Sequence, residues 1–209
     1  MKVSIITAVR NGIDTVADAI GSVHAQQYPH IEHILMDGAS TDGTAALLMN
    51  VQSRNRVVVS QADAGVYDAL NKGMELSTGD VIGVLHADDF FDSPAVVGRV
   101  AEVMQREGAD LVYGDVQYVG RSNPSRVVRF WKAGGFDRAS LRHGWMPPHP
   151  TVFIRRRLVE SVGAYDPSFR IAADYDFLLR MLMRPGIRCA YLPEVLVRMR
   201  VGGASNGSM

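Results

Sequence analysis

Cysteine is almost absent from this chain of 209 residues, which holds only Cys189. A lone cysteine has no partner for an internal disulfide and cannot form a zinc cluster by itself. In the segment IRCAYL it is expected to be a buried apolar residue. The lack of disulfides favours a reducing cytoplasm as the location.

Long hydrophobic runs are absent as well, since no apolar stretch approaches the roughly 20 residues that cross a bilayer. The apolar core of the opening MKVSIITAVRNG is too short for a secretory signal, and its valine and isoleucines are typical of a strand. The sequence has no G-x-G-x-x-G and no G-K-S/T loop, which disfavours a dinucleotide or P-loop site. A composition that is 47% hydrophobic suits one α/β domain.

Net charge is also missing, because 22 Lys and Arg balance 22 Asp and Glu. The halves differ, however: residues 1–104 contain 6 basic and 13 acidic residues, whereas residues 105–209 contain 16 basic and 9 acidic residues. This division suits a metal-centred site beside a surface for anionic partners. A solvated, arginine-rich surface would give the same totals.

The first half contains a regular alternation of two periods. Strands are expected in KVSIITA, IEHILMD, RVVVSQ and DVIGVLH, and apolar residues at helical spacing follow each of them. The third helix should turn Val66, Leu70 and Met74 inward, and Asp92-Ser93-Pro94 should cap the fourth. Short links predict a mostly parallel sheet with right-handed crossovers, in which ligands bind beyond the carboxyl ends of the strands.

The second half lacks this rhythm. LVYGDVQYVG and SRVVRFWKAG indicate the strands of a hairpin around RSNP. A short strand is expected in TVFIRR, an amphipathic helix in DYDFLLRMLMR and a mobile tail in VGGASNGSM. Without an internal repeat or a long linker, residues 1–209 are expected to form one domain.

Polar clusters follow three of the predicted strands: AVRNG, DGASTDG and HADD. Turn chemistry explains DGAS equally well, and Asp88-Asp89 could cap a helix, although Asp92 and Ser93 lie nearer to it. Together, the clusters place Asp37, Asp88 and Asp89 around one crevice. Carboxylates repel bare phosphate, but Mg²⁺ or Mn²⁺ takes one or two carboxylates plus phosphate oxygens. The acid pair therefore predicts a divalent cation beside a nucleotide diphosphate.

Six ordered segments closely resemble the family-2 glycosyltransferases of GT-A fold, most of all the bacterial enzymes that build polysaccharides and glycolipids. They are VSIITAVRNG, MDGASTDGT, GVYDALNKG, HADD, HPTVF and YDPSFRIAADYDFLLRM. The resemblance runs from about Val3 to Gly203. It implies an α/β fold with a Rossmann-like, mostly parallel sheet, helices on both faces and a smaller mixed acceptor-side region. Residues 1–104 would bind the nucleotide sugar, residues 105–203 would bind the acceptor and carry catalysis, and residues 204–209 would be a flexible tail.

The resemblance also implies the activity: inverting transfer of a sugar from a nucleoside-diphosphate sugar, preferably a UDP-sugar, to a saccharide or lipid-linked acceptor. In the nucleotide pocket, Asp37 would accept a hydrogen bond from the base. The other implied nucleotide-sugar contacts are Thr7, Ala8, Asn11, Asp63, Asn71, Lys72 and Asp88. HADD corresponds to the D-x-D-type metal motif, which makes Asp88 and Asp89 ligands of Mg²⁺ or Mn²⁺.

Asp174 matches the catalytic base of the family. An inverting transfer is a single displacement at the anomeric carbon, so a base must take the proton of the acceptor hydroxyl. The departing diphosphate needs charge stabilisation, which a metal supplies. Asp174 is also placed to cap the helix YDFLLRML, and the two roles are compatible. Asp176 should point away from Asp174.

Two departures from the family pattern stand out. His86 occupies a position where many relatives carry Asp or Asn, and Leu70 one where many carry Arg. His149, between two prolines, lies where the acceptor would enter, and either a substrate contact or a structural role fits it.

Two other classes compete with this interpretation. A sugar-1-phosphate nucleotidyltransferase normally opens with a Gly-rich loop and basic residues, whereas TAVRNGIDT offers only Gly12 and Arg10. A non-catalytic nucleotide-sugar-binding module is disfavoured by Asp174 beside an intact acid pair.

The partners expected are the donor, the acceptor and no nucleic acid. The protein is expected in the cytoplasm, where its basic second half could contact an anionic membrane on the inner face. The candidate contacts are Arg155, Arg156 and Arg157.

Overall fold

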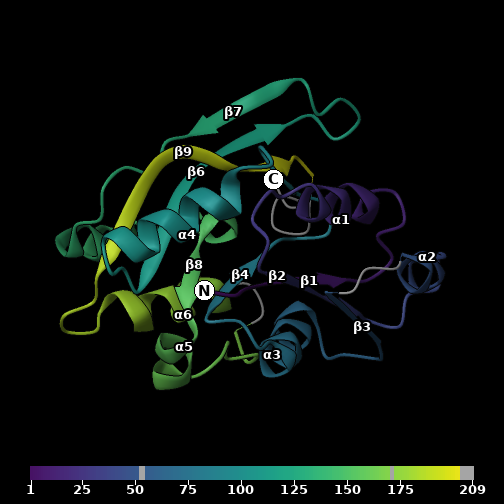
Figure 1. Ribbon diagram of the computed structural model, residues 1–209, viewed down its shortest axis with the longest axis horizontal. Helices are drawn as coiled ribbons and strands as arrows, with labels where there is room; N and C mark the ends of the chain where they lie inside the picture. Colours follow the sequence, from purple (N-terminus) through teal and green to yellow (C-terminus); the bar gives the residue numbers. More distant parts are fainter. Residues whose placement is uncertain (52–54, 170–171, 203–209) are drawn as a thin grey trace.

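The computed structural model describes residues 1–51, 55–169 and 172–202. Nine strands form one sheet with helices on both faces (Figure 1). The main strand order is β3-β2-β1-β4-β8-β6-β9-β5, and β7 pairs with β6. No helix in these ranges is long and apolar enough to cross a membrane.

The first half forms the parallel part of the sheet, as predicted. Its strands are β1 (Val3–Val9), β2 (Ile31–Asp37), β3 (Arg56–Ser60) and β4 (Val81–Val84), and all three pairings among them are parallel. Every residue of β1 is buried. Helices cover both faces of such a sheet, which explains why this strand reads as a continuous apolar run rather than an alternation.

The second half adds mixed pairings. Strand β8 (Phe153–Arg155) is antiparallel to both β4 and β6 (Leu111–Val119), so β6 runs in the same direction as β4. The predicted hairpin is confirmed by the antiparallel pairing of β6 with β7 (Val127–Trp131). The sequence did not predict β9 (Cys189–Arg200), which pairs in parallel with β6, or the short β5 (Phe90–Phe91), which pairs with β9.

Two apolar layers separate the sheet from its helices. Buried residues of α1 (Val16–His24) and α4 (Val96–Arg106) pack on one face. Those of α3 (Val66–Leu76), α5 (Arg156–Val162) and α6 (Ala173–Leu182) pack on the other. Helix α2 (Thr44–Asn50) packs with α1 through Leu48. Short 3-10 turns cover Arg138–His143 and His149–Thr151.

Helix α3 approaches the sheet closely because of Gly73. A Cβ atom at this position would lie 2.5 Å from Cγ2 of Ile6 on β1, far inside van der Waals contact. Leu70 and Met74 are buried as predicted, but Val66 is 45% exposed because it opens the helix one turn before the buried face begins. The close contact between Gly73 and Ile6 therefore fixes the position of α3, and of its first turn, at the edge of the sheet.

The predicted cap of α4 is wrong. Ala95 occupies the cap position and makes no side-chain hydrogen bond to the helix. Asp92 instead accepts a hydrogen bond from Arg198 Nε at 2.6 Å, because β9 brings that arginine alongside. Cys189, at the start of β9, is half-buried, and burial raises the pKa of its thiol to about 12. The predicted mobile tail lies mostly outside the described residues.

Candidate active site

The predicted polar clusters meet at one edge of the sheet. Strands β1, β2 and β4 are parallel, and the segments that follow them begin at Arg10, Gly38 and Leu85. The carboxyl ends of parallel strands lie at the same edge, where ligands of open α/β sheets bind.

Hydrogen bonds join the loops that follow β1 and β2. The main-chain N–H of Asn11 donates to Ser40 Oγ at 2.8 Å, and Asn11 Oδ1 accepts from the Thr41 N–H at 2.9 Å. Asn11 and Ala39 both adopt positive φ angles, of 52° and 53°. Non-glycine residues rarely adopt this conformation, so the paired loops hold a defined shape at some cost in backbone energy.

Asp37 closes β2 and is only 2% exposed. Its Oδ2 accepts hydrogen bonds from Ser60 Oγ at 2.5 Å and from the Ser40 N–H at 3.2 Å. Asp63 lies beside it: a Cβ atom on Gly38 would come within 2.4 Å of Asp63 Oδ2. Position 38 must therefore lack a side chain for the two carboxylates to share this corner.

Thr7 and Ala8 are placed differently. The Thr7 side chain is fully buried, and its hydroxyl lies 3.0 Å from His33 Nε2, inside the sheet layer. Ala8 belongs to the apolar layer under α3. Their side chains do not line the crevice, so their nucleotide contacts remain predictions that only main-chain atoms could fulfil.

The two acids of the HADD turn differ sharply in environment. Asp88 is partly exposed, and in the described part of the chain its carboxylate has no hydrogen bond or ion pair. Asp89 is 1% exposed: its Oδ1 accepts from the Arg200 N–H at 3.1 Å, and its buried Oδ2 has no partner. Burial and the neighbouring Asp88 raise the pKa of Asp89 well above its usual value.

Arg200, at the end of β9, holds this turn. Its Nη1 donates to the main-chain oxygen of Asp88 at 2.9 Å, and Nη2 pairs with Asp18 on α1. The guanidinium also stacks over the Phe90 ring, 5.0 Å from its centre. Although it carries a charge, Arg200 is only 4% exposed. The position of Asp88 thus depends on a strand from the far end of the sequence.

Asp174 lies in the first turn of α6 and faces aromatic groups from three other segments. Burial, followed by the nearby Asp174 carboxylate, raises the pKa of Tyr67 on α3. Burial, and again Asp174, raise the pKa of Tyr165. His86 also faces Asp174: burial lowers the His86 pKa, against the opposing effects of Asp88 and Asp174. The metal motif and the predicted base therefore lie within electrostatic reach of each other.

His149 belongs to the same cluster. Its Nε2 lies 2.6 Å from the Tyr165 hydroxyl, and its ring centre is 5.8 Å from that of His86. It is 8% exposed, and burial together with His86 lowers its pKa to about 3. These contacts favour the structural role over a direct acceptor contact.

The remaining predicted residues have structural partners. The Asn71 side chain exchanges two hydrogen bonds with the main chain of Tyr165, at 2.8 and 3.0 Å, and so fixes the segment that precedes α6. Lys72 pairs with Asp68 at 2.8 Å, and Asp176 pairs with Arg180 at 2.8 Å. Asp176 therefore points away from Asp174, as predicted.

Three residues of this cluster were missed by the sequence analysis. Tyr67 could have been found, because it lies four positions before Asn71 and so on the same face of α3. Tyr165 stands in YDPSF without a chemical pattern of its own. Arg200 could not have been assigned, because β9 was not predicted.

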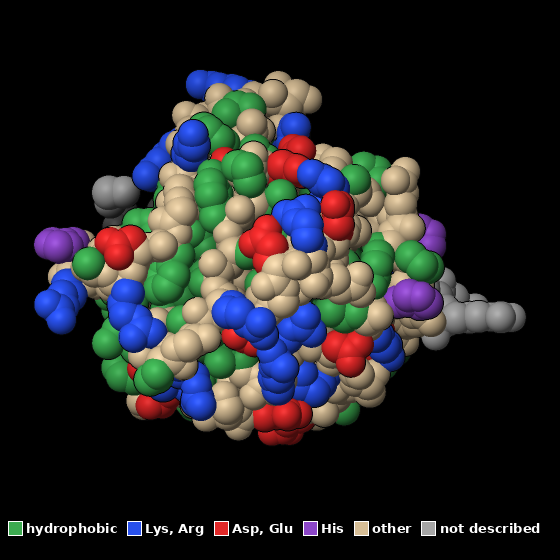
Figure 2. All heavy atoms as spheres, turned by 60° about the vertical axis from the view of Figure 1, so that its left-hand side comes forward, with side chains coloured by type: hydrophobic (Ala, Val, Ile, Leu, Met, Phe, Trp, Pro, Cys, Tyr) green, Lys and Arg blue, Asp and Glu red, His purple; other side chains and the backbone are tan. Residues whose placement is uncertain are grey.

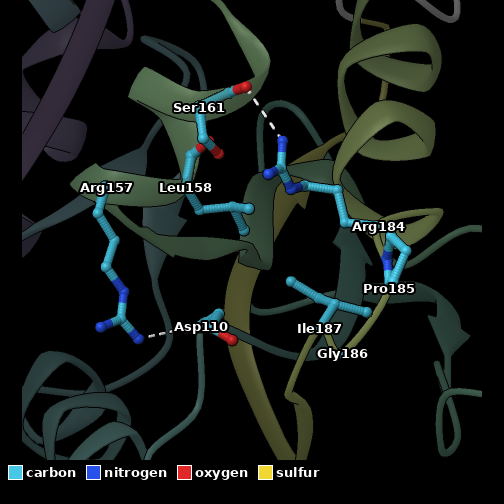
Figure 3. Close-up of a pocket in the computed structure, with 8 residues that line it drawn as sticks. All are labelled: Asp110, Arg157, Leu158, Ser161, Arg184, Pro185, Gly186 and Ile187. Carbon is cyan, nitrogen blue, oxygen red and sulfur yellow. Dashed lines mark hydrogen bonds and ion pairs between the residues drawn. The ribbon is translucent and has the colours of Figure 1, made fainter.

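A separate hollow of about 230 Å³ lies at the opposite edge of the sheet (Figure 3). Asp110, just before β6, pairs there with Arg157 at 2.5 Å, and Arg184 donates to the Ser161 main-chain oxygen at 3.0 Å. This hollow is remote from the predicted site residues, since β6 begins at this edge and ends at the other.

The structure disfavours Arg155 and Arg156 as membrane contacts, because their side chains are engaged within the protein. Arg155 donates to the main-chain oxygens of Ala109 and Met104, and Arg156 donates to Gly79 O and Ser77 Oγ. Both guanidinium groups therefore serve the fold, and Arg157 alone of the three is exposed.

Comparisons with known proteins agree with this geometry. The family model described as Glycosyl transferase family 2 matches residues 4–170. A PGL/p-HBAD biosynthesis glycosyltransferase of Mycobacterium bovis is 34% identical over 209 residues, covering 97% of this chain and 78% of the relative. The succinoglycan biosynthesis protein ExoU of Rhizobium meliloti is 27% identical over 202 residues, covering 86% of this chain and 56% of that protein.

Solved structures show the same fold at lower identity. The S. aureus TarS 1-349 complex with UDP-GlcNAc superposes with a TM-score of 0.81 at 16% identity, covering 100% of this chain and 61% of TarS 1-349. The mannosyltransferase PcManGT of Pyrobaculum calidifontis, in complex with GDP-Man and Mn²⁺, gives 0.73 at 17% identity, covering 99% of this chain and 59% of PcManGT. This chain thus spans about 60% of either solved chain. The fold is GT-A, as predicted, and the chain belongs to glycosyl transferase family 2.

Proposed function

We propose that this chain is an inverting glycosyltransferase that moves a sugar from a UDP-sugar to a saccharide or lipid-linked acceptor during synthesis of a cell-surface polysaccharide or glycolipid. One observation carries the proposal: Asp174 meets Tyr67 and His86 at the sheet edge where Asp88 offers a free carboxylate. The relatives' roles in PGL/p-HBAD and succinoglycan biosynthesis support the setting. A cytoplasmic location belongs to the same proposal.

The donor nucleotide would lie over the joined loops after β1 and β2. Asp37 and Asp63 present acceptor oxygens at the corner beside Gly38, where a base N–H and sugar hydroxyls can donate. The complex of TarS with UDP-GlcNAc supports a UDP-sugar, although PcManGT holds GDP-Man in the same fold. Asn71 would act indirectly, by holding Tyr165 in place.

A divalent cation fits the residues present. No three His, Cys, Asp or Glu side chains converge as a complete cage in the described ranges. Mg²⁺ and Mn²⁺ need no such cage at a phosphate site, because one or two carboxylates and phosphate oxygens suffice. Asp88, whose carboxylate is uncommitted, would be the direct ligand. Asp89 would contribute through its unpartnered Oδ2. When bound, the cation would supply charge stabilisation to the leaving diphosphate.

Asp174 would take the proton of the acceptor hydroxyl as that oxygen attacks the anomeric carbon from the face opposite the diphosphate. The attacking oxygen forms its bond as the bond to the diphosphate oxygen breaks, so the configuration inverts. Tyr67, which lies close to this carboxylate, would help to orient it. The half-buried His86 and the buried His149 pack ring to ring beside this cluster and would limit the directions from which the acceptor can approach.

A donor panel tests the proposal. The protein is incubated with UDP- and GDP-sugars, with Mn²⁺ or with a chelator, and the products are separated by ion-exchange chromatography. The proposal expects slow, metal-dependent release of nucleoside diphosphate, fastest with a UDP-sugar. Release of pyrophosphate from a sugar-1-phosphate and a nucleoside triphosphate would instead identify a nucleotidyltransferase. Tight nucleotide-sugar binding without turnover, even with candidate acceptors, would identify a binding module.

A further inference from the structure

The β6–β7 hairpin combines exposed apolar side chains with positive charge. Residues 116–136 contain Arg121, Arg126, Arg129 and Lys132 but no Asp or Glu. On β7 the side chains of Val127, Val128 and Phe130 are 48%, 52% and 51% exposed. The strand forms the outer rim of the molecule in Figure 1, and the projection at the top of Figure 2 carries basic and apolar side chains.

The position of β7 in the sheet does not explain this composition. Within the described ranges, β7 pairs with β6 along one edge, and four of its five residues are exposed. Soluble proteins usually protect such an edge or keep apolar groups off it, because it invites association. Several apolar side chains gathered on one exposed strand therefore indicate a surface that is covered in use.

We propose that the β6–β7 hairpin docks this protein on an anionic membrane surface. Apolar side chains such as Phe130 and Val128 would enter the boundary between headgroups and acyl chains, while the arginines would lie among lipid phosphates. Trp131, next to them, is of the residue type enriched at membrane interfaces. The positive charge of residues 116–136, a segment without Asp or Glu, is complementary to the charge of anionic lipid.

A second copy of the chain fits this surface less well. Antiparallel pairing of two β7 strands in a register centred on Arg129 would place this arginine opposite its copy, since neighbouring strands lie about 5 Å apart. Like charges at such positions are destabilising. Anionic lipid removes this repulsion, whereas a second copy adds to it.

The hairpin also lies next to the proposed active site. Val119, the last residue of β6, pairs with Arg200, which holds the main chain of Asp88. Pro124 of the hairpin turn, Phe90 and Arg200 line one hollow of about 390 Å³. Docking through the hairpin would therefore bring the rim of the crevice to the lipid surface. The idea that docking presents a lipid-linked acceptor to the crevice rests on the proposed function. The docking of the hairpin on the membrane does not depend on that function.

Vesicle sedimentation with the full chain tests the proposal. Vesicles of phosphatidylcholine alone should leave the protein in the supernatant, and vesicles containing phosphatidylglycerol should sediment it. The double variant Arg121→Gln/Arg126→Gln should weaken this binding by roughly 25-fold, because each arginine near an anionic surface contributes about fivefold. Val128→Ser/Phe130→Ser should also weaken it. In the described ranges the Arg121 and Arg126 side chains have no partner, so their removal should spare the fold.

The control is Arg157→Gln/Arg188→Gln, which removes the same charge from the opposite edge, beside the hollow of Figure 3. It should bind vesicles as the unmodified protein does. Equal losses in both charge variants would reject the hairpin as the docking element. Equal binding to both kinds of vesicle, or to neither, would reject an anionic membrane as the partner. A dimer on gel filtration that Val128→Ser/Phe130→Ser abolishes, without vesicle binding, would assign the surface to a second copy.

Discussion

Asp174 and Asp176 share the first turn of α6 but have different partners. Asp174 lies near Tyr67, whose pKa it helps to raise, whereas Asp176 pairs with Arg180. Asp174→Asn keeps the shape of the side chain but cannot take a proton, so sugar transfer should fall by at least about 10²-fold. Donor affinity and melting temperature should change little. Steady-state kinetics with donor and acceptor, alongside calorimetry of donor binding, provide the measurement.

Asp176→Asn is the matched control for this prediction. It removes one partly exposed ion pair, which contributes little to stability, and it leaves the Tyr67 contact in place. Its transfer rate should stay close to that of the unmodified protein. A larger loss at Asp176 than at Asp174 would move the base to position 176.

The site residues that the sequence identified are those at the ends of regular elements. Asp37, Asp88 and Asp174 follow or begin elements that the apolar periodicity located, so their meeting at one edge could be predicted. Thr7 shows the limit of this reasoning: strand position says where a residue lies along β1 but not that its hydroxyl turns to His33. His149 is similar, since its pairing with Tyr165 depends on a loop without periodicity.

At the scale of elements, the packing of α3 against β1 depends on one glycine. Gly73→Ala would force a Cβ atom against Ile6 Cγ2 at 2.5 Å and Met36 Cγ at 3.3 Å. Overpacking of this kind costs about 1–3 kcal/mol, which exceeds the roughly 1 kcal/mol that alanine gains over glycine in a helix. We expect a lower melting temperature and, because α3 carries Tyr67, a lower transfer rate.

Gly98→Ala in α4 is the matched control for that change. No atom lies within 4 Å of the Cβ that it would add. Here the helix propensity acts alone, so the melting temperature should rise by about 2–4 °C. If the melting temperature rose in both variants, the close contact between Gly73 of α3 and Ile6 of β1 would not restrict the residue at position 73.

The same scale shows why β9, and with it the short β5, escaped prediction. Strands β1–β4 each stand between turn residues and a helix, and this alternation is visible in the sequence. Strand β9 carries Pro193 in its interior, and the register of its pairing with β6 shifts near Tyr113 and Asp115. Proline and irregular register both remove the period of two by which a strand is recognised.

At the scale of the whole molecule, several buried groups make stability depend on pH, and His33 and Glu32 are two of them. His149, whose pKa burial and His86 lower to about 3, acts in the same direction as His33. Burial, followed by Arg56, lowers the pKa of His33 to about 3, below the 6.5 of an exposed histidine. Burial would raise the pKa of Glu32, but hydrogen bonds from Lys2, Ser4 and Thr78 outweigh it and hold that pKa at about 2. The unfolded chain therefore binds more protons than the folded chain in acid.

The free energy of unfolding should consequently fall as the pH drops. The His33 effect begins near pH 6.5 and contributes about 1.4 kcal/mol per pH unit down to about pH 3. The Glu32 effect adds to it below about pH 4.5. Urea unfolding at a series of pH values measures both. Glu32→Gln should be less stable at pH 7, by on the order of 1–3 kcal/mol after allowance for solvent around the half-exposed Lys2. Below about pH 4.5 its stability should fall less steeply than that of the unmodified protein, because the Glu32 effect is lost and the effects of His33 and His149 remain down to about pH 3. An equally steep fall in both proteins below pH 4.5 would contradict the role of Glu32.

The count of charged residues in each half of the chain predicted only in part which basic residues are available to a partner. The second half does contain an excess of basic residues, but several of these arginines bind main-chain oxygens or acidic side chains of the same chain rather than a partner. Arg155, Arg156, Arg198 and Arg200 are of this kind. Composition counts charges without saying which way the side chains turn, so the hairpin could not be singled out before β7 was seen to be exposed.

The support that Arg200 gives to Asp88 has a consequence for the order of events during synthesis. The two residues lie 112 positions apart. A ribosome that adds 5–20 residues per second delivers Arg200 on the order of ten seconds after Asp88. By then strands β1–β4 and their connecting helices have all been made, and contacts of such long range form slowly in any case. The nascent chain can thus form the parallel part of its sheet early, whereas the HADD turn acquires its support from Arg200 only after β9 has docked.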